Sequence, residues 1–80
     1  MSPRLPAVRP REVVRALERA GWQVQRQRGS HLSLKKEGSR SIVTVPMHNR
    51  DIPRGTLSGI LEDAELSVEE FVDLLRGKSK

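Results

Sequence analysis

The segment SHLSLKK, at positions 30–36, alternates polar and apolar side chains, and this alternation constrains the fold more than any other feature of the chain. Successive side chains of a β-strand point to opposite faces of the sheet. One face of this strand therefore carries Leu32 and Leu34. The opposite face carries His31, Ser33 and Lys35. Such a strand is typical of an antiparallel sheet that is covered on one face and open to solvent on the other.

Two further segments have the composition of strands. WQVQRQR occupies positions 22–28 and RSIVTVPMH positions 40–48, and the connections RGS and KEGSR are short and rich in turn-forming residues. Together the three segments predict an antiparallel meander. Trp22 and Val24 alternate with polar residues in the first segment. In the last segment one face carries Val43, Val45 and Met47, and the other carries Ile42, Thr44 and His48. Pro46 lacks the N–H for a ladder hydrogen bond, so it marks a strand end or an edge.

Helical spacing of apolar residues predicts three helices. The first runs from about Pro10 to Ala20 and ends at Gly21, which can adopt a left-handed conformation. The second, PRGTLSGILEDA, contains Gly55 and Gly59, each of which weakens a helix by about 1 kcal/mol relative to alanine. These glycines would permit close packing against a neighbouring element. The apolar stripes of the first two helices are Val13, Val14, Leu17 and Ala20, and Leu57, Ile60, Leu61 and Ala64.

The third helix, LSVEEFVDLLRGK, has the clearest start signal. Ser67 and Glu70 have the spacing of a capping box, and Leu66 and Phe71 that of a hydrophobic staple. Its predicted buried stripe is Val68, Phe71, Val72 and Leu75. The order α-β-β-β-α-α indicates an α+β fold, a three-stranded antiparallel sheet with helices on its leucine face. We expect a flexible N-terminal arm over residues 1–9, one domain over 10–77 and a tail over 78–80.

Positive charge is concentrated in the first part of the chain. Residues 1–50 hold 11 basic and 3 acidic residues, a net of +8, whereas residues 51–80 hold 4 and 7, a net of −3. This asymmetry favours contact with a nucleic acid, although a basic face can also be simply solvated. The same two interpretations apply to the row formed by Arg11, Arg15 and Arg19. Cysteines are absent from the sequence, as is any apolar run of membrane-spanning length, so we expect a cytoplasmic protein without membrane contact.

His31 is the strongest candidate for chemistry. Histidine changes charge near neutral pH and so can accept or donate a proton at working pH. Gly29 and Ser30 form a small turn beside it that would let a substrate backbone approach. The cations expected to contact phosphate are Lys35 on the same face, with Arg26, Arg28 and Lys36 nearby. These groups suffice for removing the proton of a ribose 2′-hydroxyl and cutting RNA. An exposed surface histidine without catalytic function is the other interpretation.

Other site chemistries find little support in the sequence. His48 and Asp51 have metal-ligand side chains, but two ligands do not make a zinc site. A phosphate-cradling glycine loop is absent, and Ser30 and Ser33 lack a histidine–carboxylate relay. We therefore expect neither a metal nor a cofactor.

Three segments resemble a known family when taken in order: VVRALERAGWQVQRQRGSHLSL, VTVPMHNRDIPRGTLSGIL and ELSVEEF. From about Pro10 to Phe71 the chain is similar to HicA toxins of bacterial type II toxin–antitoxin systems. The resemblance implies a fold like the double-stranded RNA-binding domain, and a ribonuclease that cuts mRNA and arrests translation. The family's catalytic histidine falls on His31. The assignments of His48 and Lys35 to RNA binding rest on geometry.

The resemblance also implies a protein partner, a HicB-type antitoxin that covers the site. Antitoxins of that type commonly carry a DNA-binding segment, so we expect no direct DNA binding by this chain alone. Two rival functions remain open. A non-catalytic RNA-binding module would use the same sheet and basic residues, although aromatic side chains for an open sheet face are missing. A purely protein-binding domain would use the acidic C-terminal helices as a docking face.

Overall fold

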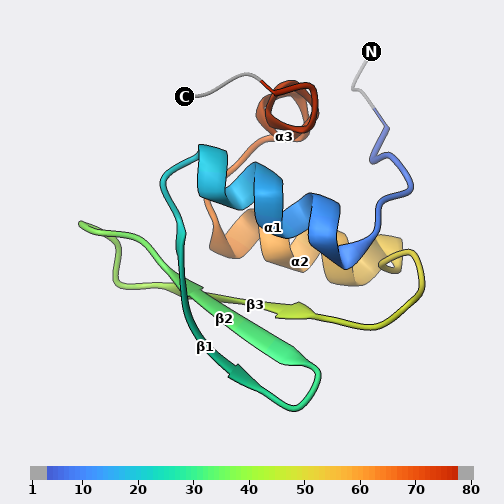
Figure 1. Cartoon of the computed structure of the whole chain (residues 1–80). Helices are drawn as coiled ribbons and strands as arrows, with labels where there is room; N and C mark the ends of the chain where they lie inside the picture. The colour runs from blue at the N-terminus through green and yellow to red at the C-terminus, as the bar shows by residue number, and fades with distance from the viewer. Residues whose placement is uncertain (1–3, 78–80) are drawn as a thin grey trace.

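The computed structural model describes residues 4–77 and has the predicted order of helices and strands (Figure 1). The elements are α1 (Pro10–Arg19), β1 (Gln23–Arg28), β2 (His31–Lys35), β3 (Ile42–Pro46), α2 (Arg54–Asp63) and α3 (Val68–Leu75). The α+β fold class is confirmed. No helix in this part of the chain combines the length and the apolar character that crossing a bilayer requires.

The three strands form one antiparallel sheet in the order β1-β2-β3. In the register of β2 with β3, Leu32 pairs with Val45 and Leu34 with Val43. These four side chains are buried. On the opposite face Ile42 remains 53% exposed. The alternation in the sequence therefore identified the covered and open faces correctly.

The helices are stacked in two layers above the covered face of the sheet (Figure 1). α1 and α2 contact the strands, whereas α3 packs against α1 on the side away from the sheet. Arg19 joins the two layers, because its Nη1 donates a hydrogen bond of 2.6 Å to the Leu74 carbonyl oxygen at the end of α3. Of the predicted arginine row, Arg11 and Arg15 are exposed and Arg19 has a structural contact.

The buried face of α3 differs from the predicted stripe. Phe71 is buried as predicted, and Val68 and Leu75 are half-buried and pack against the core, but Leu74 is buried in place of Val72, which is half-buried. The covered face of α3 is thus turned toward Leu74, because the helix packs against α1 and not against the sheet. The capping box is confirmed: Glu70 N–H donates to Ser67 Oγ at 3.1 Å, and Ser67 N–H donates to Glu70 Oε1 at 3.0 Å.

The glycines of α2 do not serve close packing. A Cβ built on Gly55 or Gly59 would meet no atom within 4 Å, so that interpretation is wrong. Gly21, in contrast, has a φ of +100°, and the Trp22 N–H donates to the Leu17 carbonyl oxygen at 3.0 Å. The predicted left-handed end of α1 is therefore present.

Residues 5–9 lie against the domain. Val8 is 2% exposed, and its carbonyl oxygen accepts a 2.8 Å hydrogen bond from the Ile52 N–H. Leu5 packs on the core, and Arg9 contacts the loop after β3. This part of the segment predicted to be a flexible arm thus has fixed contacts, because it carries apolar residues that the core accommodates. Residues 1–3 and the predicted tail 78–80 lie outside the described part of the chain.

Candidate nucleic-acid interface

His31 is the first residue of β2 and lies on the open face of the sheet. It pairs with Arg28 of β1 and Pro46 of β3. Directly paired residues share a face, so the Arg28 side chain extends beside the imidazole. The His31 side chain is exposed, and it has no hydrogen-bond partner among residues 4–77. Its ring nitrogens are therefore available to a ligand that reaches this face.

A β-bulge in β1 brings the two arginines to this face. Val24 pairs with Leu34 on the covered face, but Arg26 pairs with Ser33 and the register shifts between Val24 and Arg26. Gln25 is the extra residue, and each bulge reverses the alternation that follows it. If the same residues formed a regular strand, with Gln25 paired, Arg26 would share the helix-covered face with Val24. Val24 itself is 46% exposed, because β1 is an edge strand that the helices cover incompletely.

The turn between β1 and β2 is tight and holds the start of β2 in place. Gly29 has a φ of +56°, a conformation that side-chain-bearing residues rarely adopt. Its carbonyl oxygen accepts a hydrogen bond of 3.2 Å from Gln27 Nε2, and the Ser30 carbonyl oxygen accepts one from the Met47 N–H. The turn therefore connects all three strands at the His31 end of the sheet.

The two predicted lysines lie away from His31. Lys35 shares its face but is four residues along the strand, about 13 Å at the usual rise per residue. Lys36 is half-buried and turns to the other side, where its Cε lies 3.3 Å from the position of a Cβ on Gly21. The structure thus brings Arg28 and Arg26 close to His31, and it does not bring Lys36 there.

His48 lies in the loop that follows β3, at the same end of the sheet as His31. Its Nδ1 accepts a hydrogen bond of 3.3 Å from the Arg50 N–H, which orients the ring. Arg9 lies beside the same loop, with its Nη1 3.1 Å from the Asn49 carbonyl oxygen and its Nε 3.6 Å from an Asp51 carboxylate oxygen. The sequence did not single out Arg9, Asn49 or Met47, because only the folded chain places them beside the strand ends.

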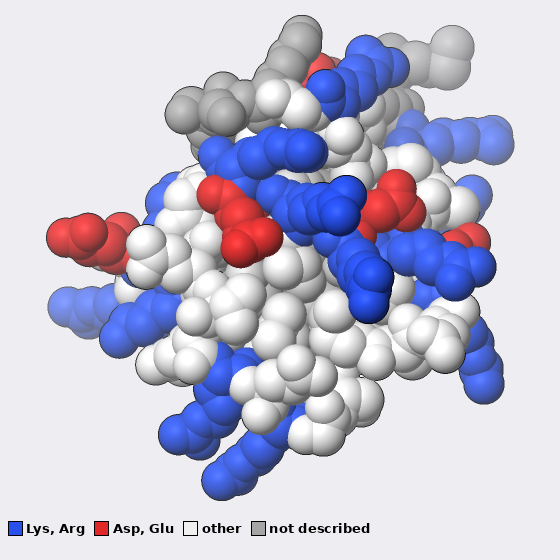
Figure 2. All heavy atoms as spheres, in the orientation of Figure 1, with Lys and Arg blue, Asp and Glu red and all other residues white. Residues whose placement is uncertain are grey.

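Basic side chains are spread over the surface that Figure 2 presents. Lys and Arg cross the surface around α1 and also project at the lower edge, beyond the strands. Within residues 4–77 no three His, Cys, Asp or Glu side chains gather as a metal-binding group. The charged side chain that the strand register places directly beside His31 is the guanidinium group of Arg28.

A comparison with protein families identifies the chain. The family model described as HicA toxin of bacterial toxin–antitoxin matches residues 10–66, more than half of the sequence. The chain belongs to the HicA family. The HicA region contains α1, the whole sheet and α2, and therefore both histidines. No curated protein sequence matches this HicA chain. As a toxin of a toxin–antitoxin system, a HicA protein implies an antitoxin partner.

Proposed function

We propose that this HicA-family toxin is an endoribonuclease that cuts mRNA without a metal ion and so inhibits translation. The observation that carries the proposal is the exposed, unpartnered imidazole of His31 among residues 4–77, which lies beside Arg28 in the register of the sheet. A base and a cation held by neighbouring strands provide the two groups that RNA transesterification needs.

In the proposed reaction His31 accepts the proton of a ribose 2′-hydroxyl. The 2′-oxygen then attacks the adjacent phosphorus in line, and the bond from phosphorus to the 5′-oxygen breaks. The products are a 2′,3′-cyclic phosphate and a 5′-hydroxyl whose proton comes from solvent. Arg28 would stabilise the extra negative charge on the phosphoryl oxygens, and Arg26 would assist from the next row of the sheet.

The remaining predicted residues have secondary roles in this proposal. Lys35, about 13 Å along β2, would contact a phosphate further along the RNA. His48 would contact RNA from the loop beyond β3. Gly29 and Ser30 would leave room for the RNA backbone to approach His31, because their turn carries no large side chain.

We test the proposal with His31→Ala and His31→Gln. Wild-type protein should cleave a long RNA in EDTA and arrest growth when expressed, and both variants should lose both effects. Thermal unfolding provides the control for folding, since His31 is exposed and its loss should leave the melting temperature nearly unchanged.

The alternatives predict different results. Full cleavage by His31→Ala would exclude His31 as the base. Salt-dependent RNA binding by wild type without cleavage would favour a non-catalytic RNA-binding module.

We further propose that a HicB-type antitoxin neutralises the toxin by covering the open face around His31. Arg26 and Arg28 project from that face and would attract acidic groups of the antitoxin. The double variant Arg26→Ala/Arg28→Ala should therefore weaken the complex with the antitoxin encoded beside the toxin, measured by isothermal titration. Unchanged affinity would place the antitoxin on another surface.

A further inference from the structure

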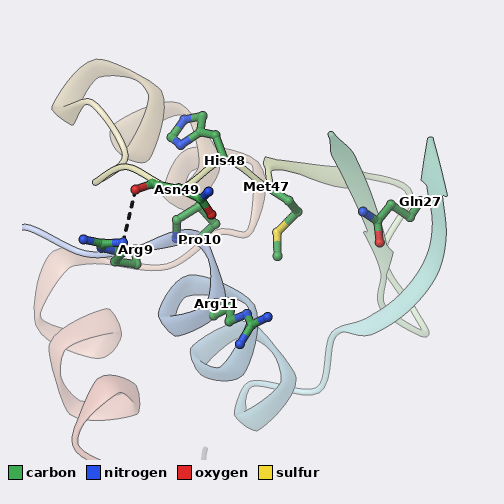
Figure 3. A pocket seen from close by; sticks show the side chains of 7 residues that line it. All are labelled: Arg9, Pro10, Arg11, Gln27, Met47, His48 and Asn49. Carbon is green, nitrogen blue, oxygen red and sulfur yellow. Dashed lines mark hydrogen bonds between the residues drawn. The ribbon is translucent and has the colours of Figure 1, made fainter. Parts of the chain in front are cut away.

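A cleft of about 590 Å³ opens between the start of α1 and the ends of β1 and β3 (Figure 3). Arg11 lines it from α1, Gln27 from β1, and Met47 and Asn49 from the chain that leaves β3. Figure 3 shows Gln27 and Met47 extending toward the space between the strands and α1, with the Arg11 guanidinium group below Met47. The His48 ring, at the margin, points away from them.

The cleft exists because β1 has no large apolar side chain at this position. Gln27 pairs with Leu32, so it lies on the helix-covered face where the core would otherwise continue. Its amide Nε2 donates to the Gly29 carbonyl oxygen, which holds the side chain at the turn. The space between Gln27 and α1 therefore remains open to solvent.

The cleft adjoins the His31 site around the end of the sheet. Gln27 and Met47 are the chain neighbours of Arg28 and Pro46, the two residues that pair with His31. His31 faces the open side and the cleft lies on the helix side. An extended polynucleotide that crosses the end of the sheet at His31 would thus present its next base to the cleft.

The side chains of the cleft suit one class of ligand. Met47, which is half-buried, offers apolar surface for the face of a planar ring, and guanidinium and amide groups also line the cleft. Arginine pairs with O6 and N7 of guanine, and asparagine or glutamine with N6 and N7 of adenine. All three thus recognise purines, and the volume is within the usual range of small-ligand pockets.

The charges in the cleft leave Arg11 available for such a contact. The Arg9 guanidinium group is already engaged by Asp51 and the Asn49 carbonyl oxygen. The hydrogen bond from Arg9 uses the backbone carbonyl oxygen of Asn49. The side-chain amide of Asn49 has no hydrogen-bond partner among residues 4–77. Arg11 likewise has no ion-pair or hydrogen-bond partner in this part of the chain.

We propose that this cleft is a nucleobase subsite that holds an unpaired purine next to the bond cut at His31 and so sets the sequence preference of the toxin. The role of this subsite in choosing the cleaved bond rests on the proposed ribonuclease function. The contacts with the base itself do not require cleavage, and this allows the two proposals to be tested separately.

The first experiment maps cleavage sites over a transcript of mixed sequence for wild type, Arg11→Ala and Asn49→Ala. Wild type should prefer a purine at one position beside the cut, and each variant should reduce that preference by about 5- to 100-fold. Arg15→Ala is the matched control, because it removes the same charge one turn along α1 and lies outside the cleft. Its base preference should equal that of wild type.

The second experiment measures binding of 2′-O-methyl oligonucleotides, which lack the nucleophile, by fluorescence anisotropy. Two oligonucleotides differ only in a purine or an abasic residue at the tested position. Tighter binding of the purine by wild type, lost in Asn49→Ala and kept in Arg15→Ala, supports the subsite even if no cleavage is detected and the ribonuclease proposal fails. Equal binding of both oligonucleotides, or a purine preference unchanged in both cleft variants, overturns the subsite while cleavage by His31 stands.

Discussion

Replacing Gly59 by alanine should stabilise the protein. Gly59 lies in the interior of α2, where its φ is not positive, and an added Cβ would meet no atom within 4 Å. The substitution therefore carries no packing cost and reduces the conformational entropy of the unfolded chain. The expected gain is about 0.5–1 kcal/mol in the free energy of unfolding. For a domain of this size that corresponds to a rise of about 2–8 °C in melting temperature.

The same substitution elsewhere provides the opposite control. Gly21 has a φ of +100°, and a Cβ there would lie 3.3 Å from Lys36 Cε. Gly21→Ala should therefore lower the free energy of unfolding by about 1–2 kcal/mol. Gly55→Ala, at the second position of α2, should stabilise less than Gly59→Ala because few helical hydrogen bonds have formed there.

Urea denaturation followed by circular dichroism measures all three changes, with the slope of the transition checked for constancy. A loss of stability in Gly59→Ala would refute the reasoning, since it would mean that α2 contacts something at this position.

Three further substitutions test the packing, each measured as a shift of the urea midpoint. Leu34→Ala should cost about 2–5 kcal/mol, because Leu34 is fully buried at the centre of the sheet. Ser67→Ala should cost about 1 kcal/mol through loss of the hydrogen bond that Ser67 accepts from the Glu70 N–H. Arg19→Met should cost about 1–2 kcal/mol, because it removes the charged donor to the Leu74 carbonyl oxygen while keeping the aliphatic stem. A change below about 0.5 kcal/mol in all three would contradict the interactions described above, since surface substitutions without specific contacts usually lie within that range.

The periodicity of apolar residues predicted the elements and the faces of β2 and β3, because one register satisfies both the turns and the core. The periodicity did not predict burial where contacts between distant parts of the chain determine it. Leu74 is buried only because α3 rests on α1, and Val8 only because the chain before α1 returns to the loop at Ile52. Nothing local in the sequence encodes either neighbour.

The position of His31 on the open face was also predictable, since alternation with Leu32 and Leu34 suffices for it. Its surroundings were not. The sequence suggested Lys35 and Lys36 as readily as Arg28, and only the pairing of strands distinguishes them. The cleft at the start of α1 joins residues from three elements, so it has no signal in any single segment.

Because Gln25 is an extra residue in β1, the face of the sheet on which Arg26 and Arg28 lie depends on the bulge. Before the bulge, Val24 lies on the helix-covered face of the sheet. After the bulge, Arg26 and Arg28 lie on the open face. Deleting Gln25 would restore a regular ladder and leave Arg26 and Arg28 on the open face, whereas pairing the same residues as a regular strand would turn both arginines under the helices, away from His31. For a chain of this kind, strict alternation applied through the first strand therefore assigns the basic residues to the wrong face, and a one-residue gap aligned with Gln25 marks the loss of the bulge and not a change in the side of the sheet that carries positive charge.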